Sequence, residues 1–545
     1  MQRSTFLRQA EEEIFDLCII GGGATGAGCA VDAALRGLKV ILVEQNDFTS
    51  STSSKSTKLI HGGVRYLEQA VKKLSLDQFK MVKKGLKERK TLLELAPFLT
   101  RPVSLVTPVK NIFAGLYYYF GLKVYDMLSG NQSLGASKWL SKTEALKKIS
   151  TLKQNFACAI MYYDGQLDDQ RYGMALVQTA SQLGATVLNH IKVTEFKKDS
   201  KGEITSLFAQ NMLDASTLNI KAKCFINATG PFSDHVRLMA NNKLKPRVRV
   251  SKGVHIILPK SIMPSTNALL IPETEDGRLV FAIPYQDNLL VGTTEDETAL
   301  ITEDFGPDKN EVEYILKYVN RYLTGDIQPS QVIAGFGGLR PLVQADENAA
   351  TKELVRDHII ETDKASKLIS VLGGKWTTYR LMAKDTIDIC EQQLNNNITP
   401  CNTDTQVLYG GKIPTAQLHE NIKTIVSFSE VIINHIVNKY GDNAVAIAQL
   451  AAGSEKLCNK IIENAPYTYA ELHYVLENEM ACTVKDVVNG RFGTQLLNWK
   501  LTLNLIQPVG NYMATYFGWT ALQQEENINN YEAELQKMIN ASINN

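Results

Sequence analysis

The chain has 545 residues, which is enough for two or more domains and a large buried core. Its apolar (44%) and charged (21%) fractions are ordinary for a soluble globular protein. Because the formal net charge is only +1, no overall field favours a nucleic acid or an acidic partner, and we expect no nucleic acid among the partners.

The eight cysteines are scattered, with no CxxC pair and no spacing typical of a metal site, so we expect no bound metal. Several lie in apolar runs, where a reduced cysteine acts as a small core residue, and this favours a reducing cytoplasm. The N-terminus lacks the apolar segment of a signal peptide, and no apolar run is long enough to cross a bilayer. The sequence therefore predicts a protein that is soluble or attached to a membrane surface.

A complete β–α–β unit opens the chain. Residues 15–20 are apolar throughout, as a central parallel strand requires, and GGGATG follows them directly. Small residues at 27–35 predict a helix, and an apolar strand at 38–43 ends at Glu44.

The glycines between the first strand and the helix predict a dinucleotide site. Gly21, Gly23 and Gly26 form a GxGxxG frame, which serves the tight turn, the approach of the backbone to a pyrophosphate and the helix–strand contact. The helix N-terminus would face the anionic pyrophosphate. Glu44 stands where a carboxylate accepts hydrogen bonds from ribose hydroxyls and disfavours the 2′-phosphate of NADP. A glycine-rich turn without a ligand is the alternative, and the order of the elements argues against it.

FAD is favoured over NAD as the dinucleotide. The glycine frame lies at the extreme N-terminus, and further strands of the same domain return much later in the chain. Residues 226–234 (INATGPFSD) resemble the ATG segment of flavoproteins with the two-dinucleotide fold, where Gly230 lets the backbone pass close to the cofactor.

Later segments predict three kinds of structure. Residues 68–95 are helical and basic, and 111–128 are aromatic-rich and helical in pattern. Short alternating runs between 170 and 345 indicate a mixed or antiparallel sheet, and two apolar strands return to the first domain. The alternating runs are 193–198, 254–259, 279–284 and 288–294, the returning strands lie in 223–230 and 367–374, and helices are expected within 421–441, 471–488 and 520–539.

The expected fold class is therefore α/β. A Rossmann-type FAD-binding domain is interleaved with a mixed or antiparallel-sheet substrate domain in residues 1–402, and an all-α domain follows. We expect the substrate part at roughly 96–170 and 245–335, and the helical domain at 403–545.

Residues 52–68 (TSSKSTKLIHGGVRYLE) concentrate polar groups after the second strand. Ser53, Ser54 and Thr57 supply hydroxyl groups, and Lys58 supplies a cation. The turn at His61 then delivers two further residues, Arg65 and Tyr66.

This segment resembles the signature of FAD-dependent glycerol-3-phosphate dehydrogenases. Three more segments match that family in order, at 250–259, 335–342 and 372–383, so the resemblance covers nearly the whole chain. A weaker match at 477–491 departs from the family pattern, because two basic residues typically stand where this chain has Asn-Gly-Arg at 489–491.

The resemblance implies oxidation of sn-glycerol 3-phosphate at C2 to dihydroxyacetone phosphate, with hydride transfer to flavin N5. It implies that Arg65, Arg340 and Lys375 hold the phosphate, with Tyr66 as a neutral donor. A structural salt bridge is the alternative role for each cation.

His255 is the candidate general base, within a catalytic set of His255, Arg340 and Lys375. A histidine among Val and Ile is also a common core residue of a strand. His61 is the competing base, better suited to a position near the flavin, and a water polarised by an arginine is a third alternative.

Residues 372–383 predict a strand, a Gly373-Gly374 turn and a helix start with Thr377 and Thr378 near the cap. A helix N-terminus there would stabilise the negative charge of a reduced flavin. The full set expected to bind the cofactor is Gly21, Gly23, Gly26, Glu44, Ser53, Ser54, Thr57, Lys58, His61, Gly230, Gly373, Gly374, Thr377 and Thr378.

A basic stretch and an aromatic one raise the question of the electron acceptor. Between Val71 and Lys90 lie eight Lys or Arg residues, and the aromatic run 112–122 follows. Together with the resemblance they favour an anionic lipid surface and a membrane quinone as partners, with the protein attached to the inner face of the cytoplasmic membrane. A solvated helix face beside an ordinary core helix is the alternative.

Other functions remain open at this point. They are an oxidase that passes electrons to O2 and forms H2O2, a non-catalytic flavin-binding protein, and a D-amino-acid or glycine oxidase, for which one arginine would suffice. The sequence leaves the oligomeric state open, with a homodimer among the alternatives.

Overall fold

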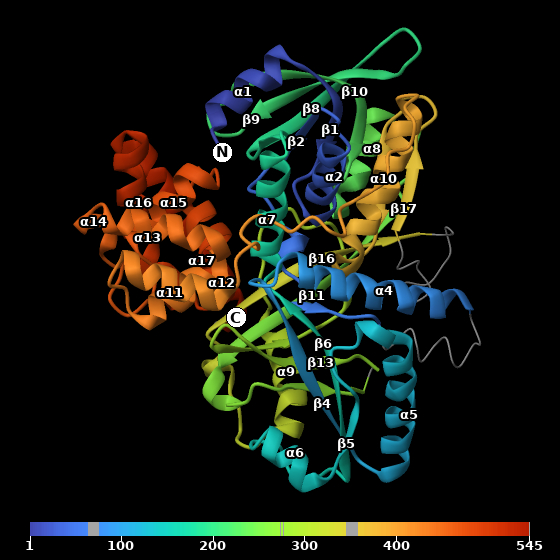
Figure 1. Cartoon of the computed structure of the whole chain (residues 1–545), viewed down its shortest axis with the longest axis vertical. Coiled ribbons are helices and arrows are strands. Elements are labelled where there is room, and N and C mark those ends of the chain that lie inside the picture. Colours follow the sequence, from blue (N-terminus) through green and yellow to red (C-terminus); the bar gives the residue numbers. More distant parts are fainter. Residues whose placement is uncertain (64–75, 273, 276, 345–357, 544–545) are drawn as a thin grey trace.

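The computed structural model describes residues 1–63, 76–272, 274–275, 277–344 and 358–543 (Figure 1). Two β-sheets form the centre of the molecule, and helices surround them. A C-terminal group of helices packs against their side.

The first sheet contains the N-terminal β–α–β unit. Its strands are β1 (Ile14–Ile20), β2 (Val40–Val43), β7 (Thr186–Leu188), β8 (Ile191–Lys198), β9 (Ile204–Asn211), β10 (Thr217–Asn227), β17 (His358–Thr362) and β18 (Ile369–Gly373). The main path runs β17–β18–β10–β1–β2–β7, and β8 and β9 continue from β10. The pairs from β18 to β7 are parallel, so their carboxyl ends meet at one edge. Ligands of open α/β sheets bind at such an edge.

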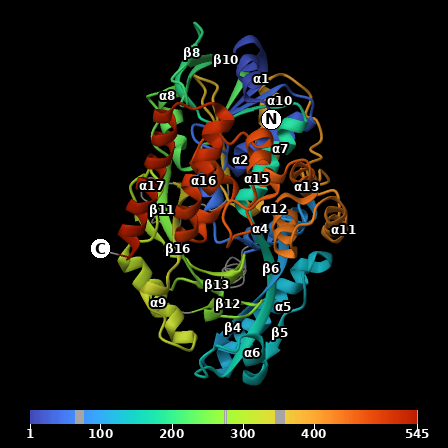
Figure 2. The ribbon, with the colours of Figure 1, turned by 90° about the vertical axis from the view of Figure 1, so that its left-hand side faces the viewer.

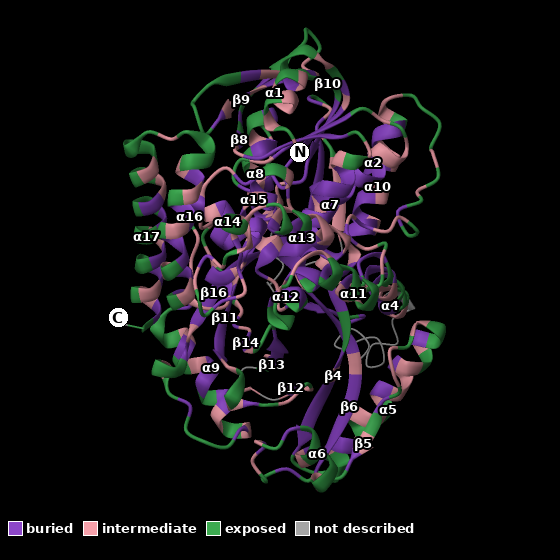
Figure 3. Ribbon diagram, turned by 60° about the vertical axis from the view of Figure 1, so that its left-hand side comes forward, coloured by how far each residue is buried: buried purple, intermediate pink, exposed green. Residues whose placement is uncertain are grey.

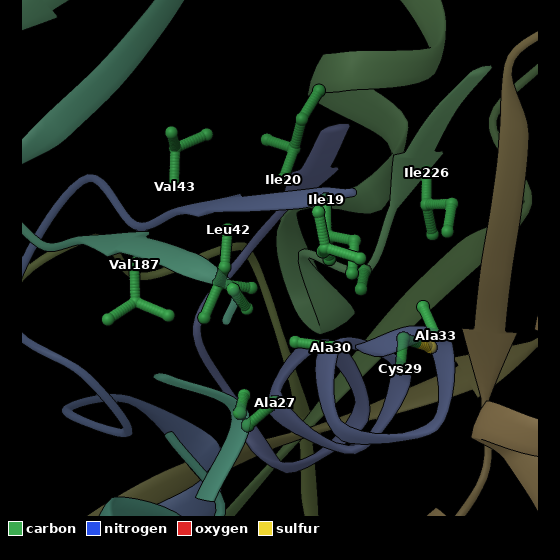
Figure 4. Packing of buried hydrophobic residues seen from close by; sticks show 14 of the residues in the cluster. Ile19, Ile20, Ala27, Cys29, Ala30, Ala33, Leu42, Val43, Val187 and Ile226 are labelled. Carbon is green, nitrogen blue, oxygen red and sulfur yellow. The ribbon is translucent and has the colours of Figure 1, made fainter. Parts of the chain in front are cut away.

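Small residues let helix α2 (Ala24–Leu35) pack tightly on this sheet. Figure 4 shows the contact between strand side chains and helix side chains, formed by Ile19, Leu42, Val187, Ile226, Ala27 and Ala30. On its other side, a Cβ at Gly28 would lie 2.7 Å from the ring of Tyr379 in α10 (Tyr379–Gln393). The helix is therefore held between the sheet and α10.

The returning strands are confirmed, since β10 pairs with β1 and β18 pairs with β10. The alternating run at 193–198 lies outside the ranges expected for the substrate part, and it is found in the mixed first sheet. It is part of β8, which pairs with β9 in the first sheet and not with the substrate strands. Alternation shows that one face of a strand is exposed, but it does not say which sheet the strand joins.

The second sheet is mostly antiparallel. Its strands are β3 (Leu59–Ile60), β4 (Thr100–Val109), β5 (Lys138–Leu140), β6 (Cys158–Leu167), β11 (Val248–Pro259), β12 (Ala268–Ile271), β13 (Val280–Tyr285), β14 (Asn288–Gly292), β15 (Asp296–Thr298) and β16 (Ala334–Val343). The path runs β15–β11–β14–β13–β12–β4–β6–β3, with β16 on β11 and β5 on β6. β16 extends beyond residue 335 because it follows β11 over ten residue pairs.

Helices flank each sheet. The first has α1 (Arg3–Glu12), α7 (Asp169–Gln182) and α8 (Ser233–Ala240) beside α2 and α10, and the second has α4 (Leu76–Leu95), α5 (Ile112–Ser129), α6 (Lys142–Lys148) and α9 (Lys309–Tyr322). None of the helices in the described ranges combines the length and the apolar character needed to cross a membrane.

The C-terminal segment is helical, as expected. Its helices are α11 (Thr415–Ile425), α12 (Glu430–Tyr440), α13 (Ala444–Ala452), α14 (Glu455–Cys458), α15 (Tyr469–Asn478), a π-helix (Asp486–Arg491), α16 (Trp499–Phe517) and α17 (Ala521–Ile543). Figure 2 shows α16 and α17 side by side in front of the sheets. These helices share one buried apolar cluster with the second sheet, so the helical domain is part of the same body.

Candidate active site

The glycine turn after β1 is shaped by close backbone contacts. Gly21 has a φ of +110°, and a Cβ there would lie 2.7 Å from the carbonyl oxygen of Ala228. A Cβ at Gly26 would lie 1.9 Å from the carbonyl oxygen of Gly21. Side chains at these two positions are therefore excluded, as the expected roles of a tight turn and a close helix contact require.

Glu44 lies beside this turn and is held by two backbone groups. The N–H of Gly22 donates to Oε2 at 2.7 Å, and the N–H of Asn46 donates to Oε1 at 2.9 Å. Burial raises the pKa of Glu44, and these two hydrogen bonds oppose the rise. The carboxylate is thus oriented at the carboxyl edge of β2, where a ribose is expected.

Ser53 completes the wall of the turn. Its Oγ accepts the Ala24 N–H at 2.9 Å, at the start of α2, and its carbonyl oxygen accepts the Trp376 Nε1–H at 2.6 Å. Gly23 gives the serine room, because a Cβ there would lie 2.9 Å from Ser53 Oγ. One serine therefore joins the glycine turn to the segment after β18.

Two residues expected to bind the cofactor are used inside the protein. The Ser54 hydroxyl donates to the Ser51 carbonyl at 3.1 Å, and Ser54 is buried. Lys58 is also buried; its ammonium forms an ion pair with Asp169 and donates to the Ser54 carbonyl at 2.6 Å. These contacts hold the loop, and a contact of either residue with the cofactor stays a prediction.

Three glycines at the edge of the first sheet have positive φ. Gly230 lies after β10 at +56°, Gly373 ends β18 at +71°, and Gly374 follows it at +88°. Lys375 then begins the turn 376–378 that leads into α10, and its carbonyl accepts the Thr378 hydroxyl at 3.3 Å. The expected strand, glycine turn and helix start is confirmed.

Thr377 is buried, and neither Thr377 nor Thr378 caps α10 with its side chain. The threonines therefore shape the turn, while the backbone of the helix start remains the polar feature of this edge.

His255 lies on β11 and is 1% exposed. Its Nε2 lies 3.0 Å from Thr57 Oγ1, and its ring stacks on Phe336 with centroids 5.0 Å apart. Burial lowers the pKa of His255 well below its usual value, and the charges of Arg340 and Lys58 lower it further. The imidazole is therefore neutral at neutral pH.

Arg340 lies on β16, opposite Ser251 of β11. Its Nη2 donates to Thr293 Oγ1 at 3.0 Å, and its guanidinium lies over Gly253, where a Cβ would be 2.3 Å from Nη1. β16 also contacts β18 and the turns at 52–54 and 230–232. The strand that carries Arg340 therefore borders the glycine-lined edge.

His61 follows β3 near a different set of charges. Its side chain is exposed, and the positive charges of Lys375 and Arg89 disfavour a charged ring. Arg65 and Tyr66 lie outside the described residues. The structure thus places His255 on the strand paired with that of Arg340, and His61 elsewhere, after β3.

Sequence reasoning missed several residues that shape this region. Gly253, Thr293 and Phe336 surround Arg340 and His255, and Asp169 neutralises Lys58. Gly253 and Phe336 lie inside segments that match the family, so their positions on paired strands were the available signal. Asp169 is separated from Lys58 by 111 residues, and no local pattern links the two.

The cradle fits FAD. Excluded side chains at Gly21 and Gly26, the carboxylate of Glu44 held by backbone groups, and a second glycine turn at 373–374 form one edge of a parallel sheet. FAD has an adenosine ribose on one side of its pyrophosphate and a ribityl chain on the other, so it needs such an extended site, with space for the pyrophosphate at the first turn.

Comparisons with known proteins show the family of the chain. A sequence model of the family described as FAD dependent oxidoreductase matches residues 16–380, and one described as the C-terminal domain of alpha-glycerophosphate oxidase matches residues 401–524. Mitochondrial glycerol-3-phosphate dehydrogenase of Rattus norvegicus is 38% identical over 94% of this chain and 72% of the relative. A probable mitochondrial glycerol-3-phosphate dehydrogenase of Caenorhabditis elegans is 39% identical, over 95% and 73%.

A similar fold is known from solved structures. Glycerol-3-phosphate dehydrogenase from Bacillus halodurans, complexed with FAD, superposes with a TM-score of 0.81 at 29% identity, over 98% of this chain and 97% of that chain. L-alpha-Glycerophosphate oxidase from Mycoplasma pneumoniae, at 18% identity and a TM-score of 0.55, shares the fold over 72% of this chain and 98% of its own. The expected α/β fold class with a C-terminal helical domain is confirmed.

The family matches cover both the sheet-bearing part and the helical part of the chain, and the two relatives match it nearly end to end. The resemblance drawn from the sequence motifs is therefore confirmed. The chain belongs to the family of FAD-dependent glycerol-3-phosphate dehydrogenases, and FAD is its cofactor.

Proposed function

We propose that this enzyme oxidises sn-glycerol 3-phosphate at C2 to dihydroxyacetone phosphate and passes the electrons to a membrane quinone. The observation that carries this proposal is the pair formed by Arg340 and His255. A cation and a neutral imidazole stand on adjacent strands that border the glycine-lined edge.

Arg340 binds the phosphate in this proposal, with Lys375, Arg65 and Tyr66. Gly253 supports the role, because the space above it admits a planar guanidinium that can turn two N–H groups toward phosphate oxygens. Lys375 stands at the other side of the edge, after Gly374, and adds a point charge. Three cations suit a dianionic phosphate better than the single carboxylate of an amino acid.

His255 accepts the proton of the C2 hydroxyl. Its lowered pKa keeps the ring neutral, as a base must be before it takes a proton, and its place on the strand paired with that of Arg340 supports this role. Thr57 orients the ring through Nε2, and Phe336 supports its face. The reaction also needs a hydride acceptor, which is the chemistry that the isoalloxazine ring of FAD supplies when bound.

The test is rapid mixing of the FAD-loaded enzyme with substrate in the absence of oxygen. Glycerol 3-phosphate is expected to bleach the yellow absorbance of the flavin, and unphosphorylated glycerol at the same concentration is expected to leave it unchanged. A flavin that stays oxidised with glycerol 3-phosphate would refute the substrate assignment and favour a non-catalytic flavin-binding protein.

Helix α5 supports contact with a membrane. Figure 3 shows exposed and half-buried residues along its outer side. The large apolar residues among them share one helical face, and Phe113 and Phe120 are 84% and 64% exposed. The exposed set is Ile112, Phe113, Leu116, Tyr117, Phe120 and Met127. Exposed aromatic faces of this kind settle at the lipid–water interface.

Neighbouring lysines give this surface a positive charge. On α4, Lys80, Lys83, Lys84 and Lys87 are exposed and can face anionic head groups. Arg89, which the basic stretch also contained, is 1% exposed and pairs with Asp164 at 2.6 Å, so it is not available to lipid. Lys72 and Lys73 lie outside the described residues.

The inner side of α5 contacts the loop that carries His61. The Tyr125 hydroxyl of α5 accepts the Gly62 N–H at 2.9 Å, next to His61. This proximity favours a lipid-soluble quinone as the acceptor, with the protein attached to the inner face of the cytoplasmic membrane. The eight free cysteines fit the reducing compartment on that side.

Acceptor identity is tested by turnover in air with and without a quinone analogue on anionic vesicles. We expect quinone reduction to exceed peroxide formation by a wide margin. Peroxide produced in equal amount to the dihydroxyacetone phosphate would instead establish an oxidase.

A further inference from the structure

Arg491 joins the helical domain to the dinucleotide-binding sheet. This arginine ends the π-helix and is 1% exposed. Its Nη1 and Nη2 donate to the two carboxylate oxygens of Asp47, at 2.6 and 3.0 Å, and Nη2 also donates to the Glu479 carbonyl at 2.7 Å. Such a two-point contact fixes the position of Asp47 in two directions.

Asp47 belongs to the same short turn as Glu44. The Asn46 N–H between them donates to Glu44 Oε1 at 2.9 Å. The turn is also bonded to the start of β8, since the N–H groups of His190 and Ile191 donate to the carbonyls of Asn46 and Glu44, at 2.8 and 2.7 Å. A displacement of Asp47 would therefore move the backbone group that orients Glu44.

The π-helix and the turn approach closely. A Cβ at Gly490 would lie 2.4 Å from Asp47 Oδ2, and the Asn489 carbonyl accepts the Gln170 Nε2–H at 2.8 Å. Asn189 binds both sides, because its Nδ2 donates to Asp47 Oδ1 at 3.0 Å and to the Met480 carbonyl at 2.9 Å. The departure from the family pattern at 489–491 thus coincides with the contact between the two domains.

We infer that Arg491 of the helical domain is a positioning residue for the adenosine ribose of FAD, acting through Asp47 on Glu44. The helical domain then helps to select the cofactor, although it contributes no residue to the glycine turn. This inference rests on the proposed contact of Glu44 with the ribose. Arg491 fixes the position of Asp47, and Asp47 fixes that of the neighbouring Asn46, whose N–H binds Glu44.

The test compares dissociation constants of the apoprotein for FAD and for FAD analogues that lack the 2′- or 3′-hydroxyl of the adenosine ribose, from the change in flavin fluorescence. In the wild type, loss of the hydroxyl bound by Glu44 should weaken binding about tenfold or more, as for a hydrogen bond to a charged group. In Arg491→Met the ratio of the dissociation constant of that analogue to the dissociation constant of FAD should fall close to one, because a misplaced Glu44 no longer distinguishes the two ligands.

The matched control is Arg171→Met. Arg171 is buried and binds the carboxylate of Glu479 through Nη1 and Nη2, at 2.6 Å each, but it does not contact Asp47. This variant disturbs the same domain boundary and should keep the wild-type ratio. Asp47→Asn, which leaves the acceptor for Asn189 in place, should lose the ratio as Arg491→Met does and serves if the latter does not fold.

Two results would overturn the inference in distinguishable ways. If the wild type binds both analogues as tightly as FAD, Glu44 does not bind the ribose, and Arg491 has no role in positioning it. A normal wild-type preference that persists in Arg491→Met and Asp47→Asn would leave Glu44 in place and reduce Arg491 to a structural contact.

Discussion

Arg340 illustrates how a single residue depends on the space beside it. Its guanidinium lies over Gly253, with Thr293 as a hydrogen-bonding partner. A planar side chain can be held in this way without being enclosed, so its outer N–H groups can meet a ligand. The missing side chain at Gly253 therefore matters as much as the arginine itself.

For Arg340→Ala we expect KM for glycerol 3-phosphate to rise roughly 10- to 150-fold, the loss of a charged hydrogen bond worth about 1.5–3 kcal/mol. FAD should stay bound, as measured by the flavin-to-protein absorbance ratio. Gly253→Ala should also raise KM, since its Cβ displaces the guanidinium. An unchanged KM in Arg340→Ala would exclude Arg340 from phosphate binding.

For His255→Gln we expect flavin reduction at saturating substrate to slow by about 10²–10⁴, the usual contribution of a general base. Because burial and the charges of Arg340 and Lys58 hold the pKa of His255 well below its usual value of about 6.5, the wild-type ring is neutral at that pH. Stopped-flow rates should show no inflection near pH 6.5. An inflection there that His255→Gln removes would contradict a buried neutral imidazole.

Lys58 and Arg89 mark the limit of sequence reasoning at this scale. The motifs predicted the segments that carry Arg340 and His255, because a family pattern preserves local order. They did not predict that Lys58 and Arg89 face Asp169 and Asp164, far along the chain. A cation's partner is set by the tertiary fold, so its sequence neighbours cannot distinguish a buried pair from a ligand contact.

Among the elements, α5 shows how a helix can be both buried and exposed. Tyr125 packs with Val82 and Leu86 of α4 on the inner side, while Phe113 and Phe120 are exposed on the outer side. The sequence predicted the helix correctly but gave no division between the two faces, because aromatic residues occur on both.

The helix expected within 421–441 is divided into α11 and α12, since residues 426–429 leave the helical path.

For Phe113→Ser combined with Phe120→Ser we expect binding to anionic vesicles to weaken by roughly tenfold or more, because two apolar side chains of about 1.5–3 kcal/mol each no longer enter the interface. Co-sedimentation measures this. Phe517→Ser, at a 42% exposed position on α16, is the control and should bind as the wild type does. Equal losses in both variants would argue against a membrane role for α5.

At the scale of the whole molecule, the helical domain is joined to the first sheet by buried charges. His190 Nε2 lies 2.8 Å from Asp486 Oδ2, with Asp47 and Arg3 nearby. Burial opposes the charged imidazole, but the attraction and hydrogen bond of Asp486 and the charge of Asp47 exceed it, so the pKa of His190 is raised. Its contribution to stability is fully present below about pH 6.5 and is lost as pH rises through the raised pKa.

We therefore expect His190→Gln to lower Tm more at pH 6 than at pH 9, because the wild-type histidine loses its charge as pH rises through its raised pKa. Thermal unfolding followed by circular dichroism at both pH values measures the difference. The same decrease in Tm at pH 6 and pH 9 would show that charge on His190 does not hold the domains together.

The order of strands in the first sheet has a consequence for synthesis on the ribosome. β1 and its glycine turn emerge first, but their neighbour β10 ends at Asn227 and β18 ends at Gly373. At about 5–20 residues per second, the nascent chain waits roughly 20–75 s before this edge is complete. The edge that binds the cofactor is thus completed late in biosynthesis, so we expect FAD to be captured only after most of the chain has been made.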